Sequence, residues 1–163
     1  MNRQRANNLL FAASVLLAFV LQLTPLPQLL LVYKPFWLAL VLIYWAIENP
    51  ERCGLGTALL LGLVGDVLTG QLLGEQAMRL VILIFIVLRF RARLRFFPMW
   101  QQALAVFALL LNDRVVVLMV RGFSGDPLPP VSFWGAPLVG MLVWPFVFLL
   151  LDDLRARLRV QES

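Results

Sequence analysis

The sequence contains no histidine and a single cysteine, Cys53. Without histidine, the chain lacks the commonest metal ligand and the usual proton carrier at neutral pH. One cysteine can form neither an internal disulfide nor a multi-thiolate metal site, so we expect Cys53 to be a reduced thiol in a short loop. These absences argue against a metal centre, and we expect no cofactor.

Charged residues are also scarce, at 14% of the 163 residues, whereas 61% are hydrophobic and the mean hydropathy is +0.87. Soluble domains of this length are about a quarter charged and about half apolar. The composition therefore predicts an all-α membrane protein, and the length suits one integral membrane domain over residues 1–163. We expect no nucleic acid partner.

Apolar runs predict the membrane-crossing helices, because a helix needs about 20 apolar residues to cross the hydrocarbon layer. We predict a polytopic bundle of about six transmembrane helices, with five as the alternative. The predicted spans are residues 9–23, 36–47, 55–73, 77–88, 100–120 and 133–151. Residues 28–33, between two prolines, are expected to form an interfacial or re-entrant piece. The first apolar run lacks a small-residue cleavage site, so we expect an uncleaved span.

Basic residues are distributed unevenly around these spans. With the N-terminus inside, the cytoplasmic segments contain ten of the fourteen basic residues. The positive-inside rule therefore places both termini in the cytoplasm, which requires an even number of spans. The five tryptophans lie mostly near predicted span ends, as expected of side chains at the membrane interface.

The stretch "GLGTALLLGLVGDVLTGQLLG", residues 54–74, places a small or acidic residue at every fourth position. These residues are Gly54, Ala58, Gly62, Asp66, Gly70 and Gly74. Small residues allow close helix packing in lipid. This face could pack against the protein's own helices or receive the transmembrane helix of a partner, and the sequence leaves both readings open. We expect the last two glycines to lie in the turn that ends the helix.

Polar residues within the predicted spans form a second candidate site. An ionised side chain at mid-bilayer costs roughly 3 kcal/mol on insertion scales, so it should find a partner. The predicted orientations bring four charged residues and one asparagine to the outer half of the third, fourth and fifth spans: Asp66, Arg79, Asn112, Asp113 and Arg114. We predict a polar cluster with Asp66 and Arg79 as its pair, serving either as a structural plug or as a proton or solute path.

Enzymatic activity is not expected. The Gly-x-Gly-Asp sequence of intramembrane aspartyl proteases is absent, because Leu63 occupies its first position. The chemistry of that class also needs two carboxylates sharing one site. A rhomboid-like serine protease would need a histidine, and the chain has none.

The segment "LRFRARLRFF", residues 88–97, alternates arginine with apolar or aromatic side chains. Its arginines are Arg89, Arg91, Arg93 and Arg95. A period of two spreads the charge around a helix, so the segment has no clean amphipathic face. We expect it at the inner membrane surface, in contact with anionic lipids or an acidic partner. The arginine-rich C-terminal tail is interpreted in the same way.

Four stretches together resemble the rod shape-determining protein MreD family in its proteobacterial form. They are "LTPLPQLLLVYKPFWLALVLIYW" (23–45), "GLVGDVLTGQLLG" (62–74), "MWQQALAVF" (99–107) and "MLVWPFVFLLL" (141–151). The resemblance extends over nearly the full length. Arg114, beside the aspartate of the fifth span, departs from the family pattern, so no family role is carried over to it.

The resemblance implies a non-catalytic inner-membrane subunit of the machinery that elongates the bacterial cell wall. It implies MreC as a direct partner, and the MreB filament and the RodA–penicillin-binding protein synthase as further partners. It also implies an architecture similar to the substrate-binding subunits of energy-coupling-factor transporters, which is a likeness of fold alone. A homodimer within the complex stays open.

We therefore interpret the chain as a membrane scaffold that binds MreC and helps to position wall synthesis. The alternative is a small-solute-binding membrane subunit of a transporter that uses the polar cluster as its site. A third reading is an assembly factor for another membrane complex.

Overall fold

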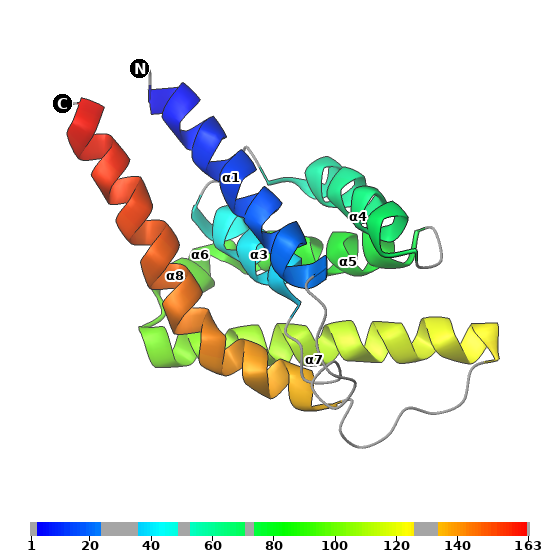
Figure 1. The fold of residues 1–163 in the computed structure, drawn as a ribbon. Coiled ribbons are helices and arrows are strands. Elements are labelled where there is room, and N and C mark those ends of the chain that lie inside the picture. The colour runs from blue at the N-terminus through cyan, green and yellow to red at the C-terminus, as the bar shows by residue number, and fades with distance from the viewer. Residues whose placement is uncertain (1–2, 24–35, 49–52, 71–73, 126–133, 163) are drawn as a thin grey trace.

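The computed structural model describes residues 3–23, 36–48, 53–70, 74–125 and 134–162. Within these ranges the regular structure is helical (Figure 1), which confirms the predicted all-α class. The helices are α1 (Arg3–Leu23), α3 (Trp37–Glu48), α4 (Leu55–Thr69), α5 (Glu75–Arg89), α6 (Arg91–Phe96), α7 (Met99–Ser124) and α8 (Gly135–Glu162). The predicted interfacial piece at residues 28–33 lies outside the described residues.

Three helices are long and apolar enough to cross a membrane, over Arg5–Leu23, Met99–Phe123 and Gly135–Arg157. Shorter apolar helices occupy Trp37–Glu48 and Leu55–Leu68. The described residues therefore fit a membrane helix bundle. The count of six spans and the likeness to energy-coupling-factor subunits stay predictions.

Several helix boundaries differ from those of the predicted spans. Helix α4 ends at Thr69, four residues before the predicted end of the third span, because Gly70 adopts a left-handed conformation with φ of 70°. Residues 91–96, expected only as an interfacial segment, form the short helix α6. Helix α8 continues beyond residue 151 as far as Glu162.

Helix α3 lies at the centre of the bundle. All ten residues from 38 to 47 are buried, and α3 packs against α1, α5, α6 and α8. A helix that is apolar on every side is stable when neighbours surround it completely. Helix α4, in contrast, packs mainly on α5 and leaves large apolar side chains such as Leu60 and Val67 exposed.

Two tryptophans lie in the core rather than at the membrane interface, contrary to expectation. Trp45 and Trp144 are fully buried. Their indole N–H groups find buried acceptors, with Trp45 donating to Ser14 Oγ at 3.0 Å and Trp144 donating to Gln102 Oε1 at 3.1 Å. A tryptophan can enter a core when its polar N–H is satisfied in this way. Cys53 is also buried, as a free thiol.

The helices alternate in direction. Ser14 in the first half of α1 meets Trp45 near the end of α3, so these two helices are antiparallel. Gln102 at the start of α7 meets Trp144 in α8. The start of α1 and the end of α8 lie at the same end of the molecule in Figure 1, in blue and red.

Candidate functional site

The carboxylate of Asp66, near the end of α4, accepts hydrogen bonds from the start of α5. Its Oδ2 accepts a hydrogen bond from the Gly74 backbone N–H at 2.8 Å, and its Oδ1 accepts one from the Gln76 N–H at 2.9 Å. Its main-chain oxygen accepts the N–H of Gly70, the residue that ends α4. The first N–H groups of a helix lack partners within the helix, and the partial positive charge there favours a carboxylate. Asp66, which is 1% exposed, therefore caps α5.

The small residues of the same segment divide into two groups. Gly62 and Ala58 are buried, and a Cβ added to Gly62 would collide with the main chain of Ala77 in α5. A Cβ added to Gly65 would collide with the side chain of Gln76. Gly62 and Gly65 therefore pack against α5 of the same chain. Gly54, by contrast, faces open space.

Gly70 and Gly74 flank the connection between α4 and α5. Both have positive φ angles, of 70° and 99°. Side chains with a Cβ rarely adopt this conformation, so glycine is the suitable residue at both positions. Gly70 ends α4 and Gly74 precedes α5, so the two glycines close one helix and open the next.

Arg79 of α5 forms a bidentate ion pair with Asp113 of α7. The Nε–Oδ1 distance is 2.9 Å and the Nη2–Oδ2 distance is 2.7 Å. The two residues are 8% and 3% exposed, and the guanidinium lies over the ring of Phe36 at 4.4 Å. The predicted Asp66–Arg79 pair is therefore wrong. The carboxylate of Asp66 is occupied by backbone N–H groups of the α5 start, and Arg79 lies one turn further on, facing α7.

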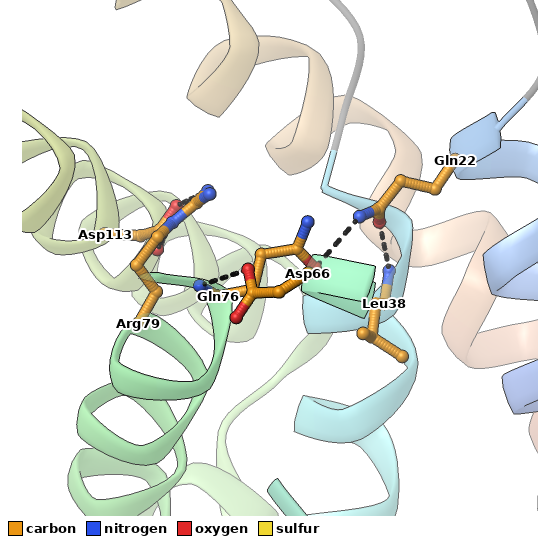
Figure 2. A network of polar contacts seen from close by, with 6 residues as sticks. All are labelled: Gln22, Leu38, Asp66, Gln76, Arg79 and Asp113. Atoms are coloured by element: carbon orange, nitrogen blue, oxygen red, sulfur yellow. Dashed lines mark hydrogen bonds and ion pairs between the residues drawn. The ribbon is translucent and has the colours of Figure 1, made fainter. Parts of the chain in front are cut away.

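Two glutamines extend the polar contacts to α1 and α3 (Figure 2). Gln22 Nε2 donates to Gln76 Oε1 at 3.5 Å, and the backbone N–H of Leu38 donates to Gln22 Oε1 at 3.3 Å. Gln76 is 1% exposed. Sequence reasoning missed both glutamines because it followed only charged residues and their neighbours. An uncharged polar side chain within or beside an apolar span is the signal that could have found them.

The remaining predicted cluster residues, Asn112 and Arg114, flank Asp113 on α7. Asn112 lines a cavity between α5, α6 and α7, and its Nδ2 atom is buried with no hydrogen-bond partner among the described residues. Arg114 and Asp113 line a small cavity of about 10 Å³. That volume is about what one water molecule needs.

A second group of polar side chains lies near the C-terminal ends of α3 and α8. Arg155, only 7% exposed, donates to Tyr44 Oη and to Glu48 Oε2, both at 3.3 Å. Tyr44 Oη in turn lies 3.5 Å from Asp152 Oδ1. Arg155 therefore belongs to the packed interior, whereas the sequence had assigned the whole tail to the lipid surface.

The four arginines of residues 89–95 also divide by their contacts. Arg91 Nε donates to the carbonyl oxygen of Ile47 at 2.8 Å, at the end of α3. The last carbonyls of a helix lack partners within the helix, and a cation is favourable there. Arg89, Arg93 and Arg95 are exposed. Arg91 thus has a role in helix packing that its neighbours do not share.

The long apolar helices, connected by buried polar contacts, fit a helical membrane protein. A model of the rod shape-determining protein MreD family matches residues 3–154. The rod shape-determining protein MreD of Haemophilus influenzae is 34% identical over 148 residues, which cover 88% of this chain and 89% of that protein. The chain belongs to the MreD family. No solved structure matches it significantly.

Proposed function

We propose that the protein is a non-catalytic scaffold of the cell-wall elongation machinery in the bacterial inner membrane. In this proposal it binds MreC directly, acts together with the MreB filament and the RodA–penicillin-binding protein synthase, and helps to maintain rod shape. Membership of the MreD family supports the role in rod shape. One structural observation supports a scaffold in particular, namely that the buried charged groups Asp66, Arg79 and Asp113 are paired within the bundle, with each other or with the main chain.

That observation rests on two sets of contacts. Asp66 is occupied by the α5 backbone, and the Arg79–Asp113 ion pair is bidentate. Carboxylates and a guanidinium paired in this way hold helices together and are not free for proton transfer or nucleophilic attack. This arrangement favours a structural role for the polar network over a catalytic one.

We further propose a single membrane domain of six spans with both termini in the cytoplasm. The support comes from the two ends of the bundle. Arg91, Arg155 and the end of α3 gather at one end, whereas Asp66 and the start of α5 lie at the other. A basic end at the cytoplasmic surface agrees with the positive-inside rule.

The alternative, a solute-binding transporter subunit, receives less support. Pockets for small molecules usually enclose about 300–1,000 Å³. The cavity beside Asp113 and Arg114 has about 10 Å³. Among the described residues, the space beside the Asp113 carboxylate therefore has room for about one water molecule and not for a solute, and the larger cavity that Asn112 lines is mostly apolar.

Co-purification with MreC tests the scaffold. We expect the full chain, expressed with tagged MreC, to be retained with it in mild detergent, and we expect depletion of the chain to make rod-shaped cells round. The control is MreC whose own transmembrane helix is replaced by an unrelated one, which should retain less of the chain. Absence of MreC association, or normal rods after depletion, would contradict the proposal.

A further inference from the structure

A cavity of about 350 Å³ lies between α5, α6 and α7. Its wall is apolar and aromatic over most of its extent, and the residues that matter here are Ile86, Phe90, Leu94, Phe97, Ala105 and Ala108. The volume falls at the lower end of the range for small-molecule sites. Two of the α7 residues are alanines, so the cavity exists because small side chains face large ones across it.

One end of this cavity is basic. An adjoining groove is lined by Arg89, Phe90, Ala92 and Arg93, and the groove and the cavity share Phe90 and Arg93. Both arginines are exposed, and no acidic residue in the described ranges forms an ion pair with either. The positive charge at this end is thus available to a ligand.

The opposite end extends along α7 as far as Asn112. From Ala105 to Asn112 the cavity follows α7 for about 10 Å, at 1.5 Å per residue. The combined site therefore has two cations at one end and a mostly apolar channel leading away from them. This distribution matches an amphiphile with an anionic head and a hydrocarbon tail.

We propose that the groove and cavity form a specific binding site for one anionic phospholipid. Arg89 and Arg93 hold its phosphate through charge-assisted hydrogen bonds, and one acyl chain lies along α7 beside Ala105 and Ala108. The assignment to the inner leaflet rests on the proposed orientation, in which α6 lies at the cytoplasmic surface. A specific site can be distinguished from general attraction to a charged membrane by means of Arg95. This arginine lines neither the groove nor the cavity, so it should contribute only to the general attraction.

Native mass spectrometry of the purified full chain with phosphatidylglycerol or phosphatidylcholine tests the arginines. We expect the Arg89→Gln/Arg93→Gln variant to bind phosphatidylglycerol about thirtyfold more weakly, from the loss of two surface arginine contacts. The charge-matched control is Arg95→Gln/Arg157→Gln, which should change binding by less than about threefold. Equal losses in both variants, or equal retention of the two lipids by the unaltered chain, would overturn the proposal.

A second pair of variants tests the apolar half. Ala108→Phe fills the cavity and should reduce retention of phosphatidylglycerol while both arginines remain. Leu104→Phe is the control, because Leu104 is an exposed residue of the same helix that does not line the cavity. Unchanged binding in the Ala108→Phe variant, or stronger retention of a polyprenyl phosphate than of phosphatidylglycerol, would overturn the assignment.

The experiments distinguish a failure of the lipid-site proposal from a failure of the proposed scaffold function. If MreC does not co-purify but phosphatidylglycerol binding depends on Arg89 and Arg93, the scaffold fails and the lipid site stands. A reporter fused after residue 97 that is found outside the cytoplasm would overturn the inner-leaflet assignment.

Discussion

The bidentate pair between Arg79 and Asp113 allows a quantitative test of how the bundle is held together. Replacing Asp113 with leucine leaves the Arg79 guanidinium, 8% exposed, without its counter-ion. Removing one partner of a buried ion pair costs about 3–5 kcal/mol, because the remaining charge stays buried. We expect Asp113→Leu and Arg79→Met each to lower the free energy of unfolding by that amount.

The double variant should lose much less than the sum of the two single losses. Replacing both members of a buried pair with apolar residues is often neutral or even stabilising. The expected coupling free energy between positions 79 and 113 is therefore at least about 3 kcal/mol, at the upper end of the range for residues in contact. The assay is reversible unfolding of the purified full chain in mixed detergent micelles, analysed as a double-mutant cycle.

A second cycle supplies the control. Positions 79 and 66 share no direct hydrogen bond or ion pair, since the Asp66 carboxylate accepts backbone N–H groups. The Arg79→Met and Asp66→Asn changes should therefore couple more weakly than the changes at 79 and 113. Additive effects at 79 and 113, or a larger coupling between 79 and 66, would refute the pairing seen in the structure.

Two further predictions concern the α4–α5 hairpin, both measured as thermal stability in detergent. Asp66→Ala removes the cap of α5 and should cost about 1–2 kcal/mol, whereas Asp66→Asn keeps an acceptor oxygen and should cost less; equal losses would show that the charge matters more than the acceptor. Gly62→Ala places a methyl group against the main chain of Ala77 and should cost about 1–3 kcal/mol. Gly56→Ala points into open space and should be neutral or slightly stabilising, and equal effects of the two glycine changes would contradict the close contact.

Hydropathy was sufficient to predict the helical class and the approximate positions of the apolar helices, but not the helix ends. The apolar character of the sequence continues beyond residue 70, so hydropathy alone extended the third span to residue 73. The backbone at Gly70 turns left-handed and ends α4 earlier. A glycine shortly after an apolar run is a recognised helix stop, and giving it more weight than the apolar residues would have placed the boundary correctly.

The wrong partner for Arg79 has a different cause. Span direction placed Asp66, Arg79 and Asp113 at a similar depth, but depth does not determine which face of a helix a residue occupies. Rotation is set by packing. Gly62 rests against Ala77, so the residue one turn after it, Asp66, faces the first turn of α5. Such a contact between specific helix faces depends on three-dimensional fit and cannot be obtained from hydropathy.

Two polar side chains whose roles were not predicted, Gln22 and Arg91, complete the ends of α3. This helix has 12 residues and is therefore about 18 Å long, well short of the ~30 Å hydrocarbon layer. Unpaired backbone groups at its ends would be costly in a bilayer. Gln22 accepts the N–H of Leu38 at one end, and Arg91 donates to the carbonyl of Ile47 at the other.

A short, buried central helix also constrains where partners can bind. Because α3 is covered along its whole length and both of its ends are held by side chains of α1 and α6, a partner cannot reach it without opening the bundle. A docking transmembrane helix must therefore contact the outer helices, among them α4, which packs mainly on α5. The small residues of α4 that face α5 are already in use, so close approach by a partner would have to occur elsewhere on that helix, near Gly56, where space is open.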